Sequence, residues 1–244
     1  KCSLMDIKEA VVIITGSAGD IGKSLVAYFE KAGSTVVCLD IVKTTQDNSF
    51  EIDLTKPDEI DFVIGEILKK YGKIDCLVNN AGNIHSEPLV NLLNRDNPRH
   101  GIQSFTRCLE LNVHTAFFAS RAVVEIMIKQ RKKGVIINVS SISAYGNAGQ
   151  SAYSAAKSAL IGLSNSWSKE LGMFGIRANS IAPGFVDTNS TSHALNPSII
   201  GHVVKNTPLR KMGNVNDICL AVEYIMKNDF VTGEVLRVDG GLRI

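Results

Sequence analysis

The chain has 244 residues with a formal net charge of +2, and hydrophobic residues make up 45% of it and charged residues 20%. This near-neutral balance is that of a folded protein and excludes a strongly basic nucleic-acid-binding chain. No apolar run approaches the ~20 residues that span a bilayer, and residues 1–10 lack the apolar core of a signal peptide, so we expect no membrane contact and a cytoplasmic location.

Short apolar runs alternate with longer segments of helical periodicity along the whole chain. The predicted strands are Ala10–Thr15, Thr35–Asp40, Phe50–Leu54, Ile74–Val78, Val135–Val139, Arg177–Ile181 and Val235–Val238. The predicted helices are 20–32, 57–71, 103–132, 152–173 and 215–227. Unbroken apolar strands indicate burial on both faces, as in a parallel sheet. The sequence therefore predicts one doubly wound α/β domain over residues 1–244, of Rossmann type, with a seven-stranded parallel sheet and helices on both faces.

Two segments do not fit this alternation. Residues 83–102 are polar and rich in turn formers, and residues 187–208 are rich in Ser, Thr and Asn. Long irregular segments in a compact domain are often binding loops, so we expect both to border a substrate site.

The first strand leads directly into T-G-S-A-G-D-I-G at 15–22, which a predicted helix follows. A glycine turn in this position lets the backbone approach a pyrophosphate, whose charge the helix start attracts. The pattern predicts a dinucleotide site that includes Gly16, Gly19, Asp20 and Ile21; the alternative is an ordinary tight turn. A carboxylate at Asp20 either repels the phosphates or stabilises the helix start.

Asp40 closes the second predicted strand, 18 residues after Gly22. An acidic side chain there can accept hydrogen bonds from the ribose hydroxyls of adenosine and would repel a 2′-phosphate. Ile41 follows it, and residues 16–22 contain no Arg or Lys. The sequence therefore favours NAD(H), although Lys43 is close enough to leave NADP(H) open.

The ends of the next two strands also carry candidate cofactor contacts. Asp53 and Leu54 follow in D-L-T, where Asp53 contacts the adenine edge or caps the helix that begins near Pro57. Asn80, Ala81 and Gly82 belong to N-N-A-G, and amides and a glycine at the carboxyl end of a parallel strand suit a ligand crevice.

Tyr153 and Lys157 are four residues apart in Y-S-A-A-K and share one face of a predicted helix. A neighbouring cation favours a phenolate, which would bring the pKa of the tyrosine toward neutral pH. Ser140 and Ser141 lie about a dozen residues upstream. The pair is a candidate acid–base centre; the alternative is two unrelated helix residues.

Taken together, the motifs resemble the short-chain dehydrogenase/reductase family in its short, single-domain form. They are T-G-x-x-x-x-I-G at 15–22, D-L at 53–54, N-N-A-G at 79–82, L-N-V at 111–113, N-V-S-S at 138–141, Y-S-A-A-K at 153–157, A-P-G-F-V-D-T at 182–188 and V-T-G-E-V-L-R-V-D-G-G at 231–241. The resemblance implies Tyr153 as general acid or base, and Lys157 as the residue that binds the nicotinamide ribose and lowers the tyrosine pKa. It also implies that Asn112 holds a relay water and that a serine, Ser141 in preference to Ser140, binds the substrate oxygen.

The same resemblance implies that Pro183, Gly184, Val186 and Thr188 fix the nicotinamide carboxamide. The expected activity is NAD(H)-dependent interconversion of a small secondary alcohol and its ketone, by a homotetramer. Alternatives are a 3-oxoacyl-carrier-protein reductase, a class that generally uses NADPH, and a non-catalytic nucleotide-binding member.

Cysteines and histidines give no sign of a metal site. The five cysteines are Cys2, Cys38, Cys76, Cys108 and Cys219, without a C-x-x-C pair. The five histidines are His85, His100, His114, His193 and His202, and no two are spaced as metal ligands usually are. We therefore expect neither a disulfide framework nor a bound metal.

Overall fold

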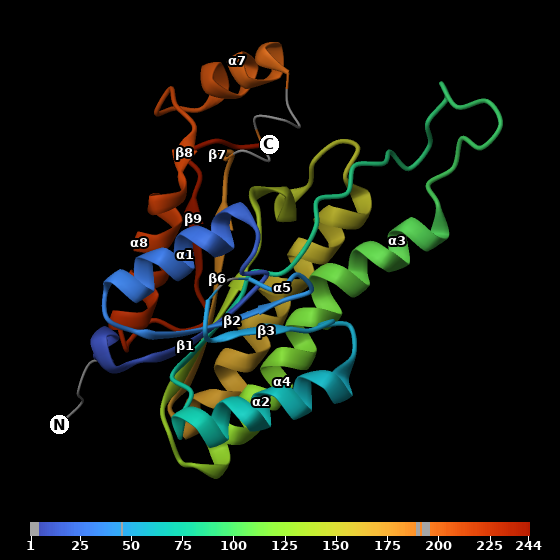
Figure 1. The fold of residues 1–244 in the computed structure, drawn as a ribbon. Coiled ribbons are helices and arrows are strands. Elements are labelled where there is room, and N and C mark those ends of the chain that lie inside the picture. Colours follow the sequence, from blue (N-terminus) through green and yellow to red (C-terminus); the bar gives the residue numbers. More distant parts are fainter. Residues whose placement is uncertain (1–4, 45, 189–190, 192–195) are drawn as a thin grey trace.

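The computed structural model describes residues 5–44, 46–188, 191 and 196–244. Cys2, His193 and part of the predicted loop 187–208 lie outside the described residues. The described chain builds a seven-stranded sheet in the order β3-β2-β1-β4-β5-β6-β9 (Figure 1), and every neighbouring pair is parallel. The strands are β1 (Val11–Thr15), β2 (Thr35–Asp40), β3 (Ser49–Glu51), β4 (Cys76–Asn79), β5 (Gly134–Val139), β6 (Ile176–Pro183) and β9 (Val235–Val238). The predicted α/β fold with its seven-stranded parallel sheet is confirmed.

Helices cover both faces of the sheet, with α1 and α8 on one face and α2, α4 and α5 on the other (Figure 1). The helices are α1 (Asp20–Lys31), α2 (Pro57–Tyr71), α3 (Ile102–Leu109), α4 (Thr115–Lys129), α5 (Ser151–Leu171), α7 (Pro197–Asn206) and α8 (Val215–Lys227). Short helical turns are η1 (Ile7–Glu9), η2 (Glu110–His114), η3 (Ile142–Tyr145) and η4 (Gly172–Phe174). A two-residue pair, β7 (Val186–Asp187) with β8 (Gly213–Asn214), lies outside the main sheet.

The alternation of β1 shows why the strands read as unbroken apolar runs. Val12 and Ile14 pack in the core under α1 and α8, whereas Val11 and Ile13 pack in the core under α2, α4 and α5. Successive side chains of a strand point to opposite faces, and here both faces are buried. Each fully buried aliphatic side chain of this kind contributes roughly 1.5–3 kcal/mol.

Three element predictions need correction. The third strand is only Ser49–Glu51, so Asp53 and Leu54 lie beyond it. The predicted helix 103–132 is two α-helices joined by the π-helical turn η2. Helix α7, whose start is capped by the Asn196 side chain at the Ile199 N–H (2.9 Å), falls in a segment that the sequence predicts as irregular. A single π-helical turn inside a longer helix is too short for a pattern of apolar residues to separate it from the α-helices on either side.

The continuous helical run Ile102–Lys129 is long and apolar enough, by length and composition, to cross a membrane. Its α4 part packs against the sheet core through Ala119, Val123 and Met127, which are fully buried. Because one face of the helix belongs to the protein core, we interpret it as a core helix.

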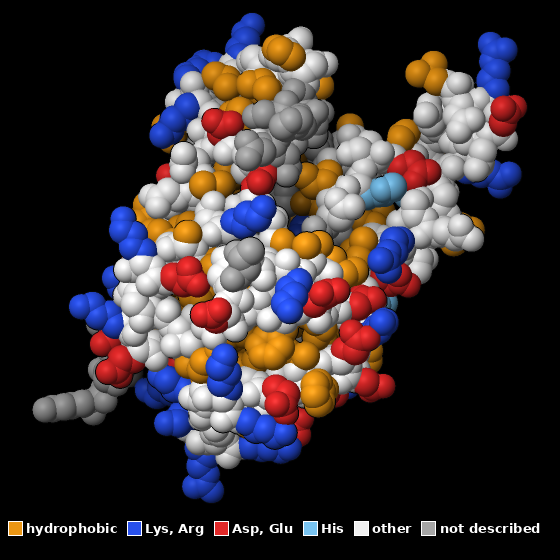
Figure 2. Space-filling view, viewed as in Figure 1, with side chains coloured by type: hydrophobic (Ala, Val, Ile, Leu, Met, Phe, Trp, Pro, Cys, Tyr) orange, Lys and Arg blue, Asp and Glu red, His pale blue; other side chains and the backbone are white. Residues whose placement is uncertain are grey.

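The predicted loop 83–102 contains a projecting hairpin, residues 89–100, which we call the arm (Figure 1). Val90 and Arg99 form an antiparallel bridge, and the His100 N–H donates to the Leu89 carbonyl at 3.0 Å. The Asn91 N–H donates to the Pro98 carbonyl at 2.6 Å. Opposite the arm stands α7, and the face between them is hollowed in Figure 2.

Candidate active site

The glycine turn after β1 and the N-N-A-G segment after β4 form one structural unit. Gly16 has a φ of +64°, and a Cβ atom there would lie 2.7 Å from the Ala81 Cα. The Asn80 side chain donates to the carbonyls of Thr15 (3.1 Å) and Gly16 (3.0 Å). The hydroxyl of Thr15 in turn accepts the N–H groups of Asn80 and Ala81, both at 3.0 Å. The turn therefore has the close backbone packing that a phosphate-binding loop needs, and glycine is required at position 16.

Helix α1 begins directly after this turn. Gly19 is the N-cap residue and Asp20 is the first helical residue. A Cβ atom at Gly22 would lie 2.1 Å from the Gly16 carbonyl oxygen, so only glycine lets the helix pack this closely on the turn. Backbone N–H groups at such a helix start suit a pyrophosphate, and the same positive helix end stabilises the Asp20 carboxylate.

Asp40 lies at the carboxyl end of β2 and faces the glycine turn. Its carboxylate accepts the N–H of Ala18 at 2.8 Å and the N–H of Val42 at 3.1 Å. Ile41 beside it is exposed. The arrangement sets a negative charge next to the turn, where it can accept hydrogen bonds from a diol and would repel a phosphate.

Asp53 does not cap α2, so that alternative is wrong. Its carboxylate accepts the N–H (3.0 Å) and the hydroxyl (2.7 Å) of Thr55, and these two bonds lower its pKa. The N-cap of α2 is Lys56, with Pro57 at the first helical position. The side chain of Leu54 is buried in the core, so only its backbone is available to a ligand.

Tyr153 and Lys157 lie in the first two turns of α5, and both are buried. The Lys157 ammonium lies 5.5 Å from the centroid of the tyrosine ring and donates to the Val139 carbonyl at 3.0 Å. The Ser141 hydroxyl accepts the Ser143 N–H at 3.1 Å and lies close enough to the Tyr153 hydroxyl to lower the pKa of that phenol. Ser140 is buried, and its hydroxyl donates to the Lys157 carbonyl at 2.8 Å. The geometry thus brings Ser141, and not Ser140, to the phenol.

Burial dominates the titration of both α5 side chains. It raises the pKa of Tyr153 to about 12, against a smaller lowering by the Ser141 hydrogen bond. It lowers the pKa of Lys157 to about 8. The expectation that Lys157 brings the tyrosine pKa down is therefore not met in this state of the protein. A lysine that is itself desolvated carries its charge at a cost, and the buried phenolate is penalised for the same reason.

Asn112 is fully buried in the π-helical turn η2. Its amide nitrogen donates to the carbonyls of Cys108 (2.9 Å) and Asn83 (3.0 Å), which fixes the orientation of the amide. Among the described residues, its Oδ1 has no hydrogen-bond partner. A Cβ atom at Gly82 would lie 2.4 Å from that oxygen and 3.3 Å from the Lys157 Nζ, so all three border one small space. A buried polar oxygen beside an ammonium is the setting in which a bound water is most stabilising.

The segment after β6 carries the remaining predicted cofactor contacts. The Gly184 N–H donates to the Val238 carbonyl at 2.9 Å, and a Cβ atom on Gly184 would lie 2.8 Å from the Asp239 Cα. Val186 belongs to β7, and Thr188 accepts the Thr191 N–H at 3.1 Å. Pro183 ends β6 beside the end of β5, so this segment borders the same edge of the sheet as Ser141.

Sequence reasoning missed a chain of buried polar side chains behind this edge. The Asn79 amide donates to Ser120 and to the Asn138 Oδ1, both at 2.8 Å, and the Asn138 amide donates to Ser164 at 2.9 Å. The signal was one asparagine in each of two otherwise apolar strands. Because an unpaired buried amide is costly, such residues hold neighbouring elements in one arrangement.

The comparisons with known proteins agree with this geometry. Residues 10–197 match the family model described as short chain dehydrogenase. The chain is 34% identical over 256 residues to the 3-oxoacyl-(acyl-carrier-protein) reductase FabG of Thermotoga maritima, covering 98% of this chain and 100% of that protein. It is 33% identical to the uncharacterized oxidoreductase C922.06 of Schizosaccharomyces pombe, covering 98% and 92%.

Among solved structures, the ligand-free aldohexose dehydrogenase AldT of Thermoplasma acidophilum matches with a TM-score of 0.86 and 28% identity, covering 98% of this chain and 96% of that one. The fold, the order of the motifs and the full-length relatives all identify the same family. The chain belongs to the short-chain dehydrogenase/reductase family, and it is an oxidoreductase that acts on CH–OH groups with NAD(P).

Proposed function

We propose that this protein transfers a hydride between NAD(H) and a small secondary alcohol or ketone, with Tyr153 as general acid–base. The observation that carries the proposal is the contact of Tyr153 with Ser141 above the buried ammonium of Lys157. Two neighbouring hydroxyl groups can bind one substrate oxygen between them. The reacting carbon is then held in one orientation, which is the larger part of such catalysis.

Tyr153 and Ser141 also handle the proton that accompanies hydride transfer. In ketone reduction the Tyr153 hydroxyl donates its proton to the substrate oxygen, and in alcohol oxidation the phenolate accepts it. Ser141 donates a hydrogen bond to that oxygen. Bound NAD(H) supplies or accepts the hydride. The space between the Asn112 Oδ1 and the Lys157 Nζ suits a water that returns protons to the tyrosine.

Asp40 supports NAD(H) as the cofactor. Its carboxylate is held against the glycine turn by two backbone N–H groups, so it has little freedom to move away from an adenosine ribose. A 2′-phosphate beside it would bring two negative charges together.

A 3-oxoacyl-(acyl-carrier-protein) reductase is the second candidate function. Identity of 34% over the full length of one such protein favours it. Asp40 opposes it, since reductases of that class generally use NADPH. The likeness to an aldohexose dehydrogenase makes aldohexoses a further substrate class to test.

The test is a turnover screen on the purified protein. NAD⁺ would be offered with secondary alcohols, aldohexoses and 3-hydroxyacyl thioesters, NADH with the matching carbonyl compounds, and NADP(H) in parallel. We expect NAD-linked turnover of one alcohol class. Turnover confined to NADPH and 3-oxoacyl thioesters would replace the proposal with the second candidate.

A homotetramer in the cytoplasm completes the proposal. Helix α5 exposes small side chains at Ala155, Ser158 and Gly162, and a Cβ atom at Gly162 would meet nothing within 4 Å. Small exposed residues on one helix face permit close packing of a second copy. Light scattering after size-exclusion chromatography would give four times the chain mass; the mass of one chain would contradict it.

A further inference from the structure

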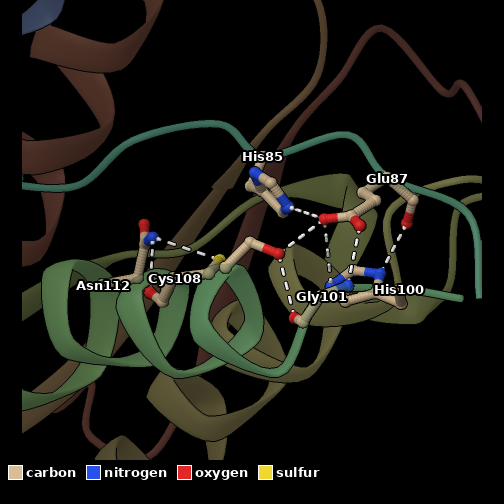
Figure 3. A network of polar contacts seen from close by, with 7 residues as sticks. His85, Glu87, His100, Gly101, Cys108 and Asn112 are labelled. Carbon is tan, nitrogen blue, oxygen red and sulfur yellow. Dashed lines mark hydrogen bonds and ion pairs between the residues drawn. The ribbon is translucent and has the colours of Figure 1, made fainter. Parts of the chain in front are cut away.

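The base of the arm carries three side chains that the mechanism does not use. His85 and Glu87 precede the arm and His100 ends it, so the hairpin brings together residues 15 positions apart (Figure 3). The His85 Nε2 lies 3.0 Å from the Glu87 Oε2, and the His100 Nε2 lies 3.7 Å from the same oxygen. All three ligand atoms lie within 4.8 Å of one another. We call these residues the imidazole–carboxylate cluster.

His100 is held with one nitrogen free to act as a ligand. Its side chain is 7% exposed, and its Nδ1 lies 3.0 Å from the Glu87 carbonyl oxygen. A carbonyl can only accept, so Nδ1 carries the proton and Nε2 of the neutral ring has a lone pair. Among the described residues, this Nε2 is buried without a hydrogen-bond partner and faces the carboxylate. Fixing one ring nitrogen on a backbone carbonyl is how proteins orient metal-binding histidines.

Glu87 is equally well fixed. Its Oε1 accepts the Gly101 N–H at 2.7 Å, and its Oε2 accepts the Ser104 hydroxyl at 2.6 Å. Gly101 is the N-cap of α3, so the carboxylate is anchored to the first turn of a helix. Hydrogen bonds from an N–H and an O–H donor favour the ionised form of a carboxyl group, which is the form that binds a metal ion.

A lone pair facing a carboxylate oxygen at 3.7 Å is repelled by it unless a cation lies between them. A proton on His100 Nε2 is one choice, but this separation is longer than a charged hydrogen bond. A metal ion with about 2.0–2.1 Å bonds to N and O ligands needs tetrahedral ligand separations of about 3.3 Å, and the distances of 3.0 and 3.7 Å bracket that value.

We propose that the His85 Nε2, the His100 Nε2 and the Glu87 Oε2 bind a divalent transition-metal ion, Zn²⁺ in the first place. Two imidazoles with one carboxylate are a zinc donor set, and the remaining position goes to water or another oxygen ligand. His85 and Glu87 are about a third exposed, and Figure 2 shows histidine and acidic side chains at the surface where the arm leaves the body, so an ion has an entry path.

The ion would join the two limbs of the arm and fix them beside the catalytic helix. Glu87 forms a bridge with Gln150, the N-cap of α5, and the Gln150 amide donates to the Ser86 hydroxyl at 3.1 Å. Gln150 also accepts the Ser143 hydroxyl at 2.9 Å. Zinc would therefore order the segment that borders the proposed substrate site, without touching the reacting atoms.

The first test measures Zn²⁺ binding by equilibrium dialysis, with metal content determined on the purified, chelator-treated protein. We expect about one ion per chain in the wild type. His85→Gln and Glu87→Gln keep the side-chain size and should each lose more than the roughly 10–100-fold in affinity that follows removal of an outer partner. His202→Gln, an exposed histidine on α7, is the matched control and should bind as the wild type does. Equal binding by wild type and His85→Gln, or no binding by either, would overturn the proposal.

A second measurement on the wild type alone does not depend on how the variants fold. X-ray absorption of the zinc-loaded protein should show only N and O ligands at about 2.0–2.1 Å, with the scattering pattern of imidazole. Sulfur at about 2.3 Å would place the ion on a cysteine and contradict the proposal. Neither measurement uses catalytic turnover, so both are independent of the proposed activity.

Discussion

The proposed catalytic side chains and the imidazole–carboxylate cluster are both groups of polar side chains, but the chain assembles them differently. Tyr153 and Lys157 come from one helix, and Ser141 follows the end of a central strand. His85 and His100 meet only because the arm folds back on itself. Regular elements fix side-chain directions from spacing alone, whereas a hairpin fixes them through its own turns and hydrogen bonds.

The first contrast separates the two neighbouring serines. Ser141→Ala removes the hydroxyl that contacts Tyr153, and we expect kcat to fall about 10²–10³-fold. Ser140→Ala removes only the bond to the Lys157 carbonyl, so kcat should change little while stability falls by about 1 kcal/mol. Steady-state kinetics and urea unfolding of both variants check this. A larger kcat loss in Ser140→Ala would reverse the assignment.

The second prediction concerns the glycine turn at Gly16. Gly16→Ala forces a Cβ atom to 2.7 Å from the Ala81 Cα at a φ of +64°, and we expect a loss of about 1–3 kcal/mol in stability together with weaker cofactor binding. Gly65→Ala in α2 is the matched control: a Cβ atom there meets nothing, and helix propensity predicts a gain of about 0.5–1 kcal/mol. Thermal unfolding with and without NAD⁺ gives both numbers. Equal effects of the two changes would show that the turn is not sterically constrained.

The contribution of the buried Lys157 side chain to the free energy of unfolding is expected to depend on pH. Its pKa is about 8 when folded and 10.5 when unfolded, so the unfolded chain binds more protons in between. The free energy of unfolding should therefore rise between about pH 8 and pH 10 and be lowest below that window. Above about pH 10 the raised pKa of Tyr153 acts in the opposite direction, because the unfolded phenol loses its proton first.

Lys157→Met should remove this rise in the free energy of unfolding with pH. At pH 7 the variant should be about 2 kcal/mol more stable than the wild type, because relief of the buried charge outweighs the lost hydrogen bond to the Val139 carbonyl. It should also be inactive. Urea unfolding across the pH range measures the slope. A variant that is less stable than the wild type at pH 7 would show that the ammonium is stabilised where it lies.

The smallest effect concerns cofactor choice. Asp40→Asn removes the negative charge beside the glycine turn, and we expect the preference for NAD⁺ over NADP⁺ in kcat/KM to narrow roughly ten-fold, or about 1.4 kcal/mol. Glu51→Gln, an exposed carboxylate opposite Asp40 in the neighbouring strand, is the control and should leave the ratio unchanged. An unchanged ratio in Asp40→Asn would refute the cofactor argument.

These contrasts show which features could be read from the sequence. The positions of the strands, the glycine turn and the Tyr153–Lys157 face follow from periodicity and motif spacing, because those patterns fix geometry within one element. The π-helical turn that holds Asn112 could not be predicted, since five residues are too few to reveal a local change in the helical period.

Other features depend on contacts between elements. The sequence left two roles for Asp53, contact with adenine or capping of α2. Capping is excluded by its hydrogen bonds to Thr55, which depend on a turn that the sequence pattern does not reveal. The direction of the Tyr153 pKa depends on how deeply α5 is buried, which spacing does not reveal. His85 and His100 had no metal-ligand spacing, because a hairpin of a dozen residues separates them.

The measurement that tests the central claim most directly is turnover by Tyr153→Phe, with NAD⁺ binding measured on the same sample. Phenylalanine keeps the buried ring and removes only the hydroxyl, so we predict normal cofactor binding and a kcat about 10²–10⁴-fold below the wild type. Tyr224→Phe, on the exposed face of α8, is the control and should turn over normally. Undiminished turnover by Tyr153→Phe would contradict the account, since no proton would then pass through this phenol.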